Sequence, residues 1–142
     1  MKTILTLTLL LVSIAATTFP LPASAGEFVV IVNKGNTATI DKEAVAKIYK
    51  GDMKSWADGA AVAPVDLPDD NPIRASFCTE IIGKTLSNMK ALWAQNVFSG
   101  KSVPPKQLPS DDEVKKFVSS NKGAIGYITS ASLDNSVKAV IK

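Results

Sequence analysis

After its first 25 residues, the chain alternates between continuous apolar runs and amphipathic segments. Residues 28–32 are apolar and rich in β-branched side chains, which predicts a strand buried on both faces, and residues 124–129 predict a second such strand. Residues 62–67 predict a further short strand, whereas residues 137–141 fit either a last strand or a short helix. Apolar side chains spaced three and four residues apart predict helices over residues 41–51, 72–82, 85–100 and 110–123.

The expected helix ends carry residues that favour helix starts. Asp41 and Ser110 are good N-caps, and Pro72 suits a first helical turn because its missing N–H costs nothing there. Strands that alternate with helices in one short chain predict an α/β fold, a single layered domain with a mixed or largely parallel sheet flanked by helices. Sheets of this kind bind ligands at strand ends and helix N-termini.

Several conspicuous side chains predict packing rather than chemistry. The longest expected helix carries one apolar stripe, which we expect to face the core; it consists of Met89, Leu92, Trp93 and Val97. Trp56 and Trp93 are expected to be packing anchors, and Cys78 a buried small hydrophobe.

The N-terminal segment has the three parts of a secretory signal. Lys2 supplies a basic start, residues 4–16 form an apolar run, and residues 23–25 are a small-x-small cleavage site. A membrane anchor is the rival interpretation, but the run is shorter than the ~20 apolar residues that a spanning helix needs. The sequence therefore predicts a signal peptide over residues 1–25 and an exported, soluble, periplasmic domain over residues 26–142, with no stable membrane insertion.

Composition excludes several classes of function. The chain of 142 residues contains no histidine, which rules out Ser-His-Asp catalysis, Cys-His catalysis and histidine metal sites. Its single cysteine cannot form an intramolecular disulfide. A net charge of +3 is too small to indicate a nucleic-acid partner. We therefore expect a protein that is not an enzyme, with no catalytic residue, no metal and no cofactor.

Two segments are candidates for anion binding. The polar loop that follows the first strand contains Asn36 and Thr37 beside a glycine, although such a loop is more often an ordinary strand-to-helix connection. The helix expected from residue 72 begins with Asn71 and carries Arg74 in its first turn, where positive charge opposes the helix dipole. An anionic ligand would account for that arginine, and so would pairing with Asp69 or with Asp70 in solvent.

An acidic cluster follows the proline-bearing loop, at residues 111–113. Three carboxylates suggest a metal site, but the first turn of a helix favours acidic residues through its dipole and caps alone. No calcium-loop pattern is present in the sequence. The cluster therefore predicts a helix start.

Four motifs in order resemble a known family. They are Ile48-Tyr49-Lys50-Gly51, Ser55-Trp56-Ala57-Asp58-Gly59, Arg74-Ala75-Ser76-Phe77 and Gly123-Ala124-Ile125-Gly126-Tyr127. Together they resemble phosphate-type substrate-binding proteins of ABC transporters, in the type 2 periplasmic binding protein superfamily. The resemblance runs from about residue 29 to residue 141, and it is strongest to short, single-lobe members of that family.

The resemblance implies one lobe of a binding protein and a phosphate or other small oxyanion as ligand. Where the family has a Ser-Gly-Thr phosphate loop, this chain has Asn71-Pro72-Ile73-Arg74, which lacks both hydroxyls and one amide donor. We therefore expect weak anion binding, with Arg74, Asn71, Asn36 and Thr37 as site residues on one open face of the sheet. The alternative is an interaction module that has lost its ligand and contacts an envelope protein or a second copy of itself.

Overall fold

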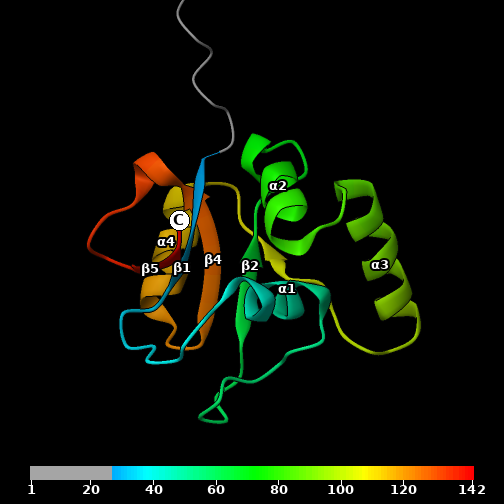
Figure 1. The fold of residues 1–142 in the computed structure, drawn as a ribbon, viewed down its shortest axis with the longest axis horizontal. Coiled ribbons are helices and arrows are strands. Elements are labelled where there is room, and N and C mark those ends of the chain that lie inside the picture. The colour runs from blue at the N-terminus through cyan, green and yellow to red at the C-terminus, as the bar shows by residue number, and fades with distance from the viewer. Residues whose placement is uncertain (1–26) are drawn as a thin grey trace, which may run out of the picture.

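The computed structural model describes residues 27–142, so the expected signal peptide lies outside the described residues. Its sheet has five strands in the order β3-β2-β4-β1-β5 (Figure 1). The strands are β1 (Phe28–Val32), β2 (Ala63–Asp66), β3 (Lys106–Gln107), β4 (Ala124–Thr129) and β5 (Lys138–Ile141). β1 is antiparallel to β4 and β5, whereas β2 is parallel to β3 and β4. The sheet is therefore mixed, and the predicted α/β class is confirmed.

Helices lie on both faces of this sheet. They are α1 (Lys42–Lys50), α2 (Pro72–Phe77), α3 (Leu86–Phe98) and α4 (Asp111–Ser120). On one face, Val114 of α4 packs so close to Gly126 of β4 that a Cβ on this glycine would lie 2.7 Å from Val114 Cγ1. On the other face, Tyr127 stacks on Phe77 of α2 with ring centroids 3.9 Å apart. Alternate residues of β4 thus serve the two halves of the core.

The strand and cap predictions are largely confirmed. All five residues of β1 are buried, as expected for a strand covered on both faces. Asp41 Oδ1 caps α1 by accepting from Ala44 N at 2.8 Å, and Gly51 ends that helix with a φ of 81°. The ambiguous segment at the C-terminus is the strand β5.

The second expected helix has two parts. α2 ends at Phe77, and a π-helical turn, η1 (Cys78–Ile82), continues it to Gly83. The apolar spacing of four residues is compatible with both geometries, so it does not reveal the change of winding. Cys78 is buried at this junction, as expected, with 4% of its surface exposed.

The prediction that the apolar stripe of α3 faces the core is confirmed for Met89 and wrong for Val97. Met89 is buried, but Trp93 is only partly covered and Val97 is 53% exposed. Asn96 is buried in their place, and its Nδ2 donates to the carbonyl of Lys50 at 3.0 Å. α3 therefore lies at the outer edge of the domain, and part of its apolar surface faces solvent.

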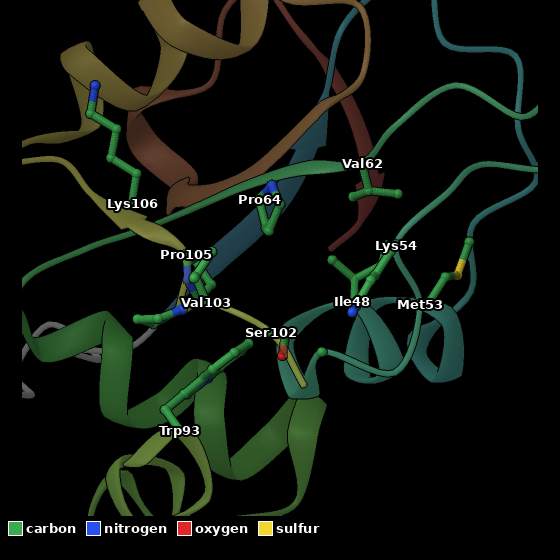
Figure 2. A pocket seen from close by; sticks show the side chains of 12 residues that line it. Ile48, Met53, Lys54, Val62, Pro64, Trp93, Ser102, Val103, Pro105 and Lys106 are labelled. Atoms are coloured by element: carbon green, nitrogen blue, oxygen red, sulfur yellow. The ribbon is translucent and has the colours of Figure 1, made fainter. Parts of the chain in front are cut away.

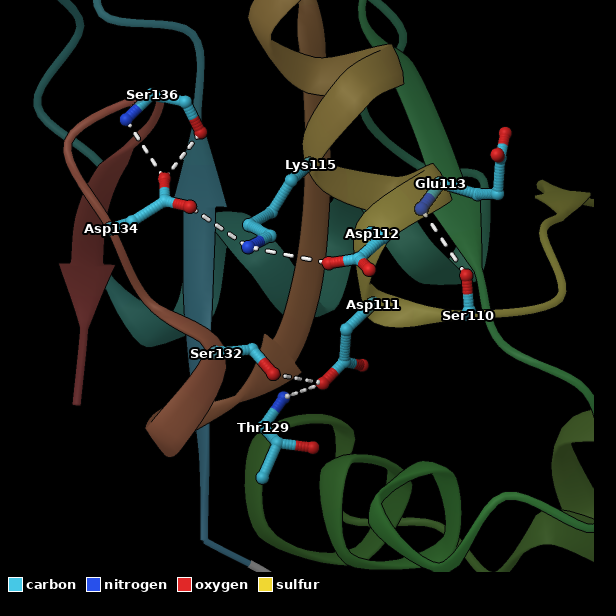
Figure 3. A network of polar contacts seen from close by, with 9 residues as sticks. All are labelled: Ser110, Asp111, Asp112, Glu113, Lys115, Thr129, Ser132, Asp134 and Ser136. Carbon is cyan, nitrogen blue, oxygen red and sulfur yellow. Dashed lines mark hydrogen bonds and ion pairs between the residues drawn. The ribbon is translucent and has the colours of Figure 1, made fainter.

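The acidic cluster starts α4 and ties it to the C-terminal segment (Figure 3). Ser110 Oγ accepts from Glu113 N at 3.3 Å, as a cap does. Asp111 Oδ2 accepts from Thr129 N at 3.1 Å and from Ser132 Oγ at 2.8 Å. Lys115 lies between two carboxylates, those of Asp112 and Asp134. These carboxylates have structural partners, which confirms the helix-start interpretation.

In residues 27–142, no helix has the length and apolar character needed to cross a membrane.

Candidate functional site

The four predicted site residues do not lie on one face. Asn36 and Thr37 follow the C-terminal end of β1, whereas Asn71 and Arg74 follow that of β2. β1 is antiparallel to β4 and β2 is parallel to it, so these two strand ends lie at opposite ends of the sheet (Figure 1). The expectation of a shared open face is therefore wrong. Strand direction decided this, and hydrophobic pattern alone does not reveal it.

The loop that contains Asn36 is held together by its own polar groups. Asn36 is buried, and its Oδ1 accepts from Ala38 N at 2.8 Å, which closes an Asx-type turn. Its carbonyl also accepts from Lys138 Nζ at 3.2 Å. Thr37 is exposed beside it. These contacts fit the interpretation of the loop as an ordinary strand-to-helix connection.

The start of α2 likewise uses most of its polar groups internally. Asn71 Oδ1 accepts from Ile73 N at 3.1 Å, and the carbonyl of Asn71 accepts from Arg74 N at the same distance. Pro72 has no N–H to offer. The backbone donors that a phosphate loop would present are therefore already bonded or missing.

Arg74 is paired with two carboxylates at the end of β2. Its side chain is 9% exposed, and its Nη2 lies 3.2 Å from Asp66 Oδ2. Its Nη1 contacts Asp69, which Lys90 of α3 also contacts. Pairing of Arg74 with Asp69 is one of the two sequence interpretations, and it is confirmed. Arg74 is buried, however, rather than directed into solvent, whereas the Asp69 side chain is 44% exposed.

Asp66 is the residue that sequence reasoning missed. Asp66 is the last residue of β2, whose other residues are apolar. A carboxylate at the end of an apolar strand is the feature of the sequence that could have identified it. Burial raises the pKa of Asp66, and the hydrogen bond from Tyr127 and the charge of Arg74 oppose this rise. Tyr49 donates to the carbonyl of Val65 at 2.7 Å, and burial raises its pKa as well. We call Asp66, Asp69, Arg74 and Tyr127 the Arg74 cluster.

Arg74 also has one donor without a partner. Among residues 27–142, no hydrogen-bond acceptor reaches its Nε, although this atom is buried. Together with Lys90 of α3, which contacts Asp69, the cluster holds two carboxylates and two cations, so its net charge is small. An anion that binds here competes with these carboxylates for Arg74. Residues 27–142 contain no grouping of three or more Cys, Asp or Glu side chains suited to a metal ion.

A second candidate site is an open groove of about 460 Å³ beside α3 (Figure 2). We call it the α3 groove. Its walls come from the C-terminal part of α1, the start of β2, and the segment that leads into β3. The lining residues are Ile48, Gly51, Met53, Lys54, Val62, Pro64, Trp93, Ser102, Val103, Pro104, Pro105 and Lys106. A groove of this size lies in the range of ligand pockets.

Comparisons with solved structures identify the fold. A phosphate transport receptor of the ABC type from Vibrio cholerae is 24% identical with a TM-score of 0.62, over 80% of this chain and 45% of that chain. A putative phosphate ABC transporter substrate-binding protein with bound phosphate, from Clostridium perfringens, is 24% identical with a TM-score of 0.65, over 80% and 44%. A third, PstS from Borrelia burgdorferi, is 18% identical with a TM-score of 0.61, over 81% and 46%.

The chain thus spans less than half the length of these structures, in agreement with the expectation of one lobe. No curated protein matches it. The family described as the PBP superfamily domain matches residues 14–141, which is most of the sequence. The chain therefore belongs to this family, the PBP superfamily domain.

Proposed function

We propose that this chain is an exported, periplasmic binding domain without catalytic activity, and that it binds phosphate or a similar small oxyanion weakly through Arg74. Family membership supports a binding role. The similar structure from Clostridium perfringens is described with bound phosphate, and the one from Vibrio cholerae as a phosphate transport receptor. N-terminal sequencing of the periplasmic product should give Gly26 as the first residue, and an intact Met1 would contradict export.

The unpartnered donor of Arg74 is the observation that carries the proposal. A buried guanidinium follows the C-terminal end of β2, and its Nε has no acceptor within the described residues. Open α/β sheets bind ligands at such strand ends. Guanidinium groups match oxyanions well because their donors form a rigid fork. An oxyanion that accepts from Nε would satisfy this donor.

Competition from carboxylates explains why the binding should be weak. An anion reaching Arg74 must displace Asp69, whose side chain is 44% exposed and therefore able to move. The nearby Asp66 repels the anion while it is ionised. We expect a dissociation constant near the millimolar range, about 4 kcal/mol of binding free energy.

A matched pair of variants tests the proposal. Asp69→Asn frees Arg74 from one competing carboxylate, and Asp70→Asn removes the same charge from the neighbouring exposed residue. Titration of the mature chain with inorganic phosphate, followed by NMR at constant ionic strength, should show tighter binding by about threefold to tenfold in Asp69→Asn only. An equal gain in both variants would mean that the change in overall charge causes the tighter binding and that Arg74 is not part of the site.

The alternative, an interaction module without a small ligand, is favoured by the internal pairing of Arg74 with Asp66 and Asp69. That pairing satisfies the arginine without any anion. Absence of phosphate-dependent shifts in the wild-type chain and in Asp69→Asn would support this alternative. The partner would then be an envelope protein or a second copy of the chain.

A further inference from the structure

We propose that the α3 groove is a docking site for an extended segment of another protein, in which an apolar side chain is flanked by carboxylates. The groove lies beside α3 and the start of β2, whereas Arg74 follows the opposite end of β2. The inference therefore stands independently of anion binding.

Apolar side chains dominate the lining of the groove. Trp93 from α3, Ile48 from α1 and Pro64 from β2 enclose it on different sides (Figure 2). Val103 and Pro105 contribute from the segment before β3. Trp93 is only partly covered, so its indole offers a broad apolar surface that a partner side chain can cover.

Exposed apolar side chains also lie near the groove residues in sequence. In the described part of the chain, the large apolar side chains that lie mostly in solvent are Val97, Phe98 and Val103, with 53%, 94% and 80% of their surfaces exposed. All three lie within seven residues of one another, at the end of α3 and in the loop that follows. Val103 belongs to the groove lining, and Val97 follows Trp93 by one helical turn. Large apolar side chains exposed in such a region are typical of a protein interaction surface.

The charge of the groove specifies the partner. Of its described lining residues, Lys54 and Lys106 are charged and none is acidic. The Lys106 side chain points away from Trp93 (Figure 2), and its Nζ lies 5.9 Å from the ring centroid of Phe117, so this exposed ammonium group serves a partner only after the side chain turns toward the groove. The neighbouring carboxylate of Asp52 is already bound by Lys101, at 2.5 Å. Lys54 Nζ donates to a carbonyl, that of Lys101, and each ammonium group has three donors, so it can still bind a carboxylate. The complementary partner therefore carries Asp or Glu beside its apolar residue.

The edge of the sheet favours an extended partner. β3 is the terminal strand of the sheet and pairs only with β2 there, so its outer edge is open. Lys106 belongs both to β3 and to the groove lining. Addition of an extended segment to such an edge is a common mode of peptide recognition.

Selection from a displayed library of random twelve-residue peptides tests the proposal. The mature chain should enrich peptides with an apolar residue next to Asp or Glu. Synthetic copies of these peptides should shift the indole N–H signal of Trp93 in NMR spectra and leave that of the buried Trp56 in place. Assignment of the two indole signals uses Trp93→Phe.

A charge-matched pair of double variants controls the experiment. Lys54→Glu with Lys106→Glu should weaken peptide binding at least tenfold, whereas Lys34→Glu with Lys122→Glu, neither of which lines the groove, should change it less than twofold. Circular dichroism confirms that both double variants are folded. Enriched peptides without acidic residues, equal losses in the two double variants, or failure to enrich any peptide that moves the Trp93 signal would overturn the proposal. Self-association that Val103→Asp abolishes would assign the groove to a second copy of the chain and would also overturn it.

Discussion

The Arg74 cluster and the α3 groove differ in how far the chain satisfies its own groups. In the cluster, the side chains of Arg74 and Asp66 are 9% and 13% exposed, and nearly every charge meets an opposite charge. In the groove, an indole and several proline rings remain open to solvent. A polar, paired site resists new ligands because each must displace a partner, whereas an apolar surface gains free energy when it is covered.

Exchange of the arginine should have the largest effect. Arg74→Met leaves Asp66 buried without its cation, so we expect a loss of about 3 to 5 kcal/mol in the free energy of unfolding, measured in urea. Lys90→Met breaks only an exposed pair with Asp69 and should cost less than about 1 kcal/mol. Adding Asp66→Asn to Arg74→Met should recover part of the loss. Equal costs for Arg74→Met and Lys90→Met would mean that the ion pair of Arg74 with Asp66 contributes no more to stability than an exposed pair does.

The pH dependence of stability should identify Asp66 as the strained member of the cluster. Its pKa is raised above the ordinary 3.8, chiefly by burial, so the folded state binds the proton more tightly than the unfolded state does. The stability that Asp66 contributes is therefore greatest when the carboxyl is protonated, and it falls as the pH rises through the folded pKa.

Asp66→Asn provides the comparison. Over the pH range above 3.8 in which Asp66 of the folded chain loses its proton, the wild-type chain should lose stability relative to Asp66→Asn, as followed by urea unfolding at each pH. Asp52 and Asp134 act in the opposite direction, because their ion pairs and hydrogen bonds lower their pKa values, and both variants retain them. A constant difference across this range would contradict the raised pKa.

Local signals predicted most of the fold. The strands β1 and β4, the cap at Asp41 and the stop at Gly51 follow from apolar runs, side-chain oxygens and a left-handed turn, which are properties of neighbouring residues. The exposed side of α3 could not be predicted in this way. Spacing indicates that a helix has an apolar face, but only the three-dimensional arrangement shows whether another element covers it.

The candidate site was less predictable because it depends on strand direction. The four expected residues come from two strand ends, and only the antiparallel placement of β1 shows that these ends lie apart. Asp69 could be proposed as a partner of Arg74 because it is near in sequence, whereas Asp66 became evident only once its burial was known. Lys90 reaches the cluster from α3, which no local pattern indicates.

Removal of the groove indole should cost less than removal of a core ring. Trp93 is partly exposed, and one part of its ring packs against Gly51, where an added Cβ would lie 3.1 Å from the ring. Trp93→Ala therefore loses packing on one side only. We expect a loss of about 1 to 2 kcal/mol in unfolding free energy for Trp93→Ala, against about 3 to 5 for Phe77→Ala, which removes a ring stacked on Tyr127. Similar losses would show that the groove is part of the core.

The groove lysines should have the smallest effect on stability. Lys54 and Lys106 are exposed. Lys54 Nζ donates to the carbonyl of Lys101, and Lys106 Nζ lies 5.9 Å from the ring centroid of Phe117. Both contacts are weak in water. Lys54→Glu and Lys106→Glu should each change the free energy of unfolding by no more than about 0.5 kcal/mol.

The size of this effect decides whether the lysines are available to a partner. A charge that the fold itself requires must leave its contacts before it can bind a carboxylate, and part of the binding free energy is then lost. A loss above about 1 kcal/mol for either variant, measured by urea unfolding, would show that the fold requires the lysine more than it requires an ordinary exposed charge. Near-neutral values, together with the large cost expected at Arg74, would show that the charges of the cluster stabilise the fold. The groove lysines would then be charges that the fold does not need and that another molecule can bind.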